Sequence, residues 1–74
     1  MIQLTVKNSL DTKTDVVSAD TTIREAFEQF GIAMGNAIPW LDGEPVGDKL
    51  DMSLRDLGAG DVANLSAIPK KDNN

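Results

Sequence analysis

The chain has 74 residues, of which 41% are hydrophobic, and a formal net charge of −5. This length supports one domain with a single core, and the acidic balance has the wrong sign for a protein that binds a nucleic-acid backbone. The chain has no cysteine and no histidine, which excludes disulfides and thiolate metal sites and removes the most common general base. The opening residues lack the pattern of a signal peptide, and no segment has the length and apolarity of a membrane span, so the sequence predicts a soluble, cytoplasmic domain.

The first two elements are predicted to be strands. Residues 2–7 (IQLTVK) alternate between apolar and polar side chains, which is the period of a strand with one buried face. The polar residues 8–11 indicate a turn, after which residues 13–19 (KTDVVSA) can return as an antiparallel strand. The register of this second strand stays open, because Val16 and Val17 are adjacent and must point to opposite faces.

Residues 21–35 are predicted to form a helix. Thr22 is a favourable N-cap, and Glu25 follows it at the spacing of a capping box. Gly35 is a better candidate than Gly31 for the end of the helix. Arg24 and Glu28 have the i,i+4 spacing of a weak ion pair. Helical spacing places five side chains on one apolar stripe, namely Ile23, Ala26, Phe27, Phe30 and Met34.

The second half of the chain is predicted to complete a sheet under this helix. Residues 37–41 (AIPWL) and 45–46 (PV) flank an Asp-Gly turn, and their prolines favour short or edge strands. A helical turn is expected at residues 54–57, with Ser53 as its cap, before the last strand at residues 62–68 (VANLSAI). Residues 70–74 follow Pro69 without any apolar side chain and are expected to form a flexible tail.

The order of these elements predicts the fold class. If the first and last strands lie side by side in the middle of the sheet, the helix packs diagonally across one face. The prediction for residues 1–69 is therefore an α+β domain, a β-grasp roll with a mixed sheet of four to five strands and one helix.

With these elements in place, the sequence resembles the ubiquitin-like family over nearly the whole chain. The opening MIQLTVK resembles the first strand of that family, and ADTTIREAFEQF matches its pattern of Asp and Thr before a helix that begins with Ile. The segment WLDGEPV resembles its third-to-fourth strand turn, and SLRDLGAGDVANLSAI is similar to its ending. Conjugated members and sulfur carriers end in Gly-Gly, whereas no glycine follows Gly60 here. The resemblance is therefore to a non-conjugating member and implies a bacterial context.

Catalytic and metal motifs are not found. Asp42, Glu44, Asp48 and Asp51 are close in sequence, but their spacing does not fit an EF-hand, and a solvated acidic loop explains them. The segment GAGD lacks the Lys-Ser/Thr of a phosphate-binding loop, and no serine has a histidine to activate it. The sequence thus predicts no enzymatic activity, no cofactor and no metal.

Trp40 is the main candidate for a binding residue. It is the sole tryptophan, and tryptophan is enriched at binding hot spots. By the resemblance, Trp40 occupies the position of the outward hydrophobic residue of the ubiquitin-like recognition patch, and Ile68 is its neighbour on the last strand. A core role for Trp40 stays open, because alternation does not decide which face it shares with Ile38. Leu10, at the tip of the first hairpin, is a possible third anchor.

These observations favour a monomeric, non-catalytic module that binds a protein partner, and neither nucleic acid nor membrane, through the sheet face opposite the helix. Two alternatives stay open. One is a modifier or sulfur carrier whose C-terminus is processed or altered. The other is a structural or phage accessory subunit.

Overall fold

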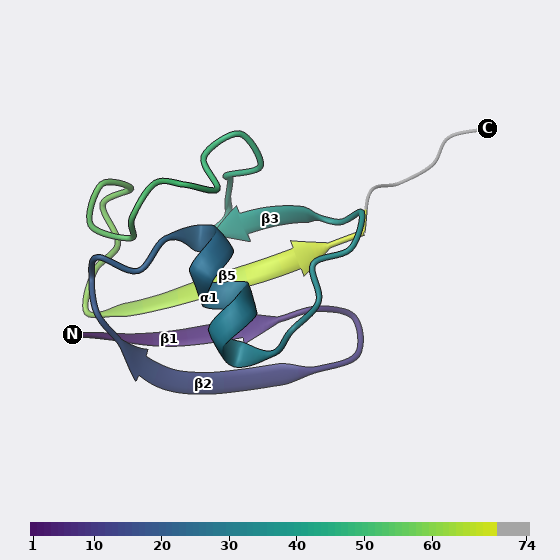
Figure 1. The fold of residues 1–74 in the computed structure, drawn as a ribbon, viewed down its shortest axis with the longest axis horizontal. Coiled ribbons are helices and arrows are strands. Elements are labelled where there is room, and N and C mark those ends of the chain that lie inside the picture. The colour runs from purple at the N-terminus through teal and green to yellow at the C-terminus, as the bar shows by residue number, and fades with distance from the viewer. Residues whose placement is uncertain (70–74) are drawn as a thin grey trace.

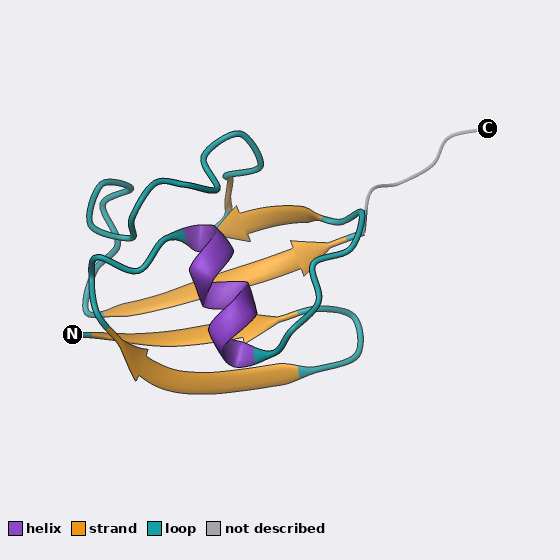
Figure 2. Cartoon of the chain, viewed as in Figure 1, coloured by secondary structure: helices purple, strands orange, loops and turns teal. Residues whose placement is uncertain are grey.

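The computed structural model describes residues 1–69, and the expected tail at residues 70–74 lies outside the described residues. One helix and five strands follow each other as β1 (Ile2–Lys7), β2 (Thr12–Val17), α1 (Ile23–Phe30), β3 (Ile38–Leu41), β4 (Glu44–Pro45) and β5 (Val62–Ile68). The strands form one sheet in the order β2-β1-β5-β3-β4. β1 and β5 are parallel neighbours at its centre, whereas the other pairs are antiparallel. α1 lies across one face of this sheet (Figures 1 and 2), which confirms the predicted β-grasp arrangement.

Pairing between β1 and β2 settles the register that the sequence left open. Val17 lies opposite Ile2 and is buried, whereas Val16 lies opposite Gln3 and is 52% exposed. The turn between these strands is held by Asn8, whose Oδ1 accepts hydrogen bonds from the backbone N–H groups of Leu10 (2.8 Å) and Asp11 (2.7 Å). β2 begins at Thr12, one residue earlier than predicted, and ends at Val17.

The start of α1 has the predicted capping box. The Thr22 hydroxyl accepts from the Glu25 N–H at 3.1 Å, and the Glu25 carboxylate accepts from the Thr22 N–H at 3.0 Å. The next free donors are satisfied from the loop after β4: the N–H groups of Ile23 and Arg24 donate to the carbonyls of Met52 and Leu50. The helix start and this loop therefore hold each other in place.

Replacing Thr22 with alanine is expected to lower the free energy of unfolding by about 1 kcal/mol, because the Glu25 N–H loses its acceptor. Urea denaturation followed by circular dichroism measures this change. Thr22→Ser is the matched control, since it keeps the hydroxyl and should retain most of the stability. If the alanine variant were as stable as the original protein, the capping box would not stabilise the helix.

The end of α1 differs from the prediction. Gly31, not Gly35, ends the helix in a left-handed conformation (φ 67°). Its N–H donates to the carbonyl of Glu28, and the Ile32 N–H donates to that of Phe27, which together form a Schellman motif. This early end allows Ile32 to enter the core, where it is 3% exposed. Four members of the predicted stripe lie buried on the helix, whereas Met34 lies beyond it and is partly buried.

The predicted pair between Arg24 and Glu28 is also replaced. The Arg24 Nε donates to Asp51 at 3.0 Å, in the loop after β4, and both side chains are largely exposed. The same loop is tied to the segment before α1 by a second exposed ion pair, between Arg55 and Asp20. Exposed pairs of this kind stabilise little by themselves, so the backbone hydrogen bonds contribute most to this attachment.

The β3–β4 turn follows the expected chemistry. Asp42 (φ 49°) and Gly43 (φ 89°) both have positive φ, as a two-residue type I′ hairpin requires. The Ser53 hydroxyl accepts from the Asp56 N–H at 3.0 Å and so caps the predicted turn at residues 54–57. The core lies between the sheet and α1, and its fully buried large side chains are Leu4, Val6, Ile23, Leu54 and Leu65.

Candidate protein-binding face

The face of the sheet opposite α1, here called the outer face, is exposed to solvent. Figure 1 views the sheet from the side that α1 covers, so the outer face is turned away from the viewer. Residues directly opposite each other in paired strands share a face. The register therefore assigns these residues to the outer face: Gln3, Thr5, Lys7, Thr12, Thr14, Val16, Ile38, Trp40, Pro45, Val62, Asn64, Ser66 and Ile68.

Trp40 lies on this outer face and not in the core. Its neighbours Pro39 and Leu41 are buried on the helix side, whereas Trp40 itself is partly buried. It is paired with Ser66 of β5 on one side and with Pro45 of β4 on the other. The Trp40 side chain is thus partly covered by the sheet and partly open to solvent.

Ile68 is close to Trp40, as the resemblance implied. It lies at the end of β5, is 49% exposed and is paired with Ile38. Because Trp40 is paired with Ser66, two residues before Ile68, the two side chains are diagonal neighbours on adjacent strands. Ile38, Trp40, Pro45 and Ile68 form one apolar surface, which we call the Trp40 patch. Sequence reasoning did not name Ile38 and Pro45 as binding residues, although alternation already placed Ile38 on the same face as Trp40.

Leu10 lies apart from this patch. It is 87% exposed in the β1–β2 turn and lines a shallow groove with residues 33–37, Ala67 and Pro69. Ala67 belongs to the helix side of β5, and no member of the Trp40 patch lines this groove. The structure therefore brings Trp40 and Ile68 together and leaves Leu10 at the end of the sheet.

A second group of exposed apolar side chains occupies the other end of the outer face. Val16 is 52% exposed and Val62 is 62% exposed, and both flank Gln3 in one row across three strands. A polar row separates this end from the Trp40 patch, and in it the hydroxyls of Thr5 and Thr14 are 2.8 Å apart. This second group could not be predicted from the sequence, because residues from three distant segments form the row.

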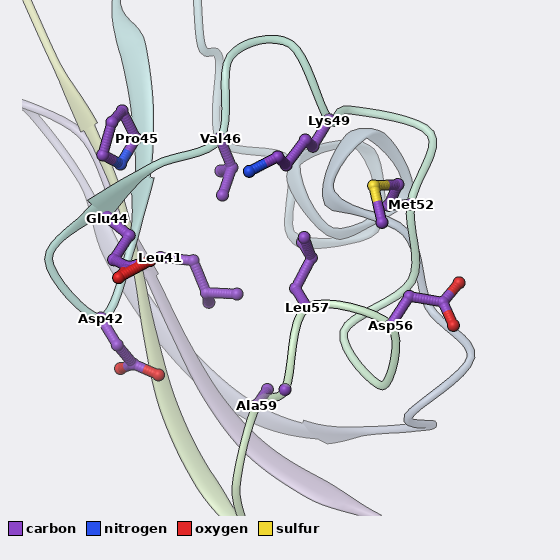
Figure 3. Close-up of a pocket in the computed structure, with 11 residues that line it drawn as sticks. Leu41, Asp42, Glu44, Pro45, Val46, Lys49, Met52, Asp56, Leu57 and Ala59 are labelled. Atoms are coloured by element: carbon purple, nitrogen blue, oxygen red, sulfur yellow. The ribbon is translucent and has the colours of Figure 1, made fainter.

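Figure 3 shows a groove of about 470 Å³ on another part of the molecule, between the β3–β4 turn and the loop after β4. Leu41, Val46 and Leu57 line its floor, and Asp42, Glu44 and Asp56 lie around it. One Asp42 carboxylate oxygen already accepts from the Asn64 N–H at 2.9 Å. Within residues 1–69, no three acidic side chains are grouped so that they could hold a metal ion.

The strand order, the single helix and the exposed outer face define a small α+β domain of the β-grasp class. Comparison of the chain with protein-family models, with curated proteins and with solved structures finds no significant match. In the described part of the chain, no helix has the length and apolarity needed to cross a membrane.

Proposed function

We propose that this β-grasp domain is a non-catalytic protein-interaction module that binds its partner through the outer face. The Trp40 patch is the centre of the contact, as the resemblance to ubiquitin-like proteins suggests. Leu10 takes part only where a partner extends around the end of the sheet.

One observation carries this proposal: the sole tryptophan is partly buried on a sheet face that is open to solvent, next to Ile38, Pro45 and Ile68. Exposed aromatic side chains set in a flat apolar surface are typical anchors of protein interfaces. Sheet residues are also held rigidly by their neighbours, so little conformational entropy is lost when a partner covers them. A half-exposed Ile68 beside Trp40 extends the apolar surface.

The proposal is tested by selecting peptides that bind the immobilised domain from a random dodecapeptide phage library. Nuclear magnetic resonance shifts of the ¹⁵N-labelled domain then locate the contact. We expect the largest shifts in β3 and β5, around Trp40, Ser66 and Ile68. A library without binders would contradict the proposal, as would peptides whose shifts lie in α1 or in the groove of Figure 3.

A further inference from the structure

The outer face differs in charge from the rest of the molecule. The chain has twelve acidic residues, yet Lys7 is the only charged side chain among the strand residues of the outer face. The described carboxylates lie in turns and loops, on α1, or on the helix side of β2 and β4, where Asp15 and Glu44 are paired with Leu4 and Leu41. The strand residues of the outer face thus carry no carboxylate, although the protein is acidic.

Lys7 is directly linked to the Trp40 patch by strand pairing. It lies opposite Ser66 of β5, and Ser66 lies opposite Trp40 of β3. Neighbouring strands are about 4.8 Å apart, so the backbone positions of Lys7 and Trp40 are separated by roughly 10 Å. Among residues 1–69, the ion pairs are those of Arg24 and Arg55, and Lys7 takes part in neither.

This arrangement limits what can cover the face. A partner that covers Trp40 and extends across β5 reaches Lys7 and removes water from its ammonium group, which is costly unless a carboxylate replaces that water. A second copy of this domain, facing the first, brings another Lys7 and no carboxylate from the strands of its outer face. Self-association through this face therefore brings no strand carboxylate that could compensate Lys7.

We propose that the partner is a protein segment with apolar side chains for the Trp40 patch and an Asp or Glu carboxylate about 10 Å away that pairs with Lys7. This inference rests on the proposed function and specifies the chemistry of its partner. The carboxylate fixes the orientation of the segment across β3, β5 and β1, because the Trp40 patch and Lys7 define one direction on the sheet. Carboxylates elsewhere on the domain repel an acidic segment and so disfavour other docking positions.

The dodecapeptides selected on the unmodified domain provide the probe. We expect them to contain an Asp or Glu at a constant spacing from an aromatic or aliphatic residue. Lys7→Gln should weaken their binding about fivefold, and Lys7→Glu should weaken it further. Added sodium chloride should weaken binding to the unmodified domain more than binding to Lys7→Gln. Lys13→Gln is the matched control, because Lys13 is exposed on the same hairpin but lies opposite Val6, on the helix side; it should bind as the unmodified domain does.

The outcomes separate this inference from the proposed function. Peptides without acidic residues, or affinities unchanged in Lys7→Gln, would overturn the inference even where Trp40→Ala abolishes binding. Peptides that bind Trp40→Ala as well as the unmodified domain would overturn the proposed function and the inference with it. A dimer at micromolar concentration that Trp40→Ala dissociates, measured by sedimentation equilibrium, would make a second copy the occupant and would also overturn the inference.

Discussion

Replacing Phe27 with alanine is expected to lower the free energy of unfolding by about 3 to 5 kcal/mol, because a large core side chain is lost and a cavity remains. Phe27 is 5% exposed at the middle of the apolar stripe of α1. Its carbonyl also accepts from the Ile32 N–H, so the Phe27 backbone takes part in the turn that ends the helix. A domain of this size has little stability to spare, and this single change can remove most of it.

Urea denaturation followed by circular dichroism measures the effect. Gln29→Ala is the matched control on the exposed side of the same helix, and it is expected to change the free energy of unfolding by less than about 0.5 kcal/mol. If the Phe27 variant and the Gln29 variant unfolded at the same urea concentration, the stripe would not form the core, and the packing of α1 on the sheet would be wrong.

The sequence was sufficient for the elements whose signals are local. Strict alternation located β1, the Thr22–Glu25 spacing located the start of α1, and the Asp-Gly pair located the β3–β4 turn. In each case the side chains that define the element are neighbours in the sequence. The β-grasp order followed from these elements, because a single amphipathic helix needs one sheet face to cover it.

The predictions for the end of α1 and for the ion pair of Arg24 were wrong because residues distant in the sequence determine both. Gly31 and Gly35 both have positive φ in the structure, so a local rule could not choose between them. The choice depends on Ile32, which reaches the core only if the helix ends at Gly31. Arg24 pairs with Asp51 and not with Glu28 because the carbonyls of the loop after β4 accept hydrogen bonds from the N–H groups at the start of α1, which brings Asp51 near.

The candidate site was predicted only in part for the same reason. Alternation in β3 left the face of Trp40 open, and pairing with Ser66 of β5 decides it. The row from Lys7 through Ser66 to Trp40 joins three segments, and its order depends on the parallel pairing of β1 with β5. For Leu10, the position at the hairpin tip was predicted correctly from the sequence. Its side chain, however, lines a groove to which no residue of the Trp40 patch contributes.

Replacing Trp40 with alanine should weaken binding of the selected peptides by 2 kcal/mol or more, about thirtyfold, as expected for the central aromatic residue of an interface. The expected loss of stability is smaller than that of Phe27→Ala, because Trp40 is only partly buried and its truncation leaves no enclosed cavity. Isothermal titration calorimetry measures the first effect and urea denaturation the second. Val62→Ala is the matched control, since Val62 lies on the same face but outside the Trp40 patch.

The emission of Trp40 in the unmodified domain provides an independent check, because the chain has no other tryptophan. A partly buried indole on the outer face should emit at longer wavelength than a core tryptophan, and acrylamide should quench it. Binding of a peptide over the Trp40 patch removes water from the ring, so the emission should shift to shorter wavelength and quenching should decrease. Short-wavelength emission that acrylamide cannot quench, together with a loss of about 3 to 5 kcal/mol of stability in Trp40→Ala, would place the indole in the core. In that case Trp40 could not anchor a partner, and Ile68 would be the remaining anchor of the Trp40 patch that the sequence predicted.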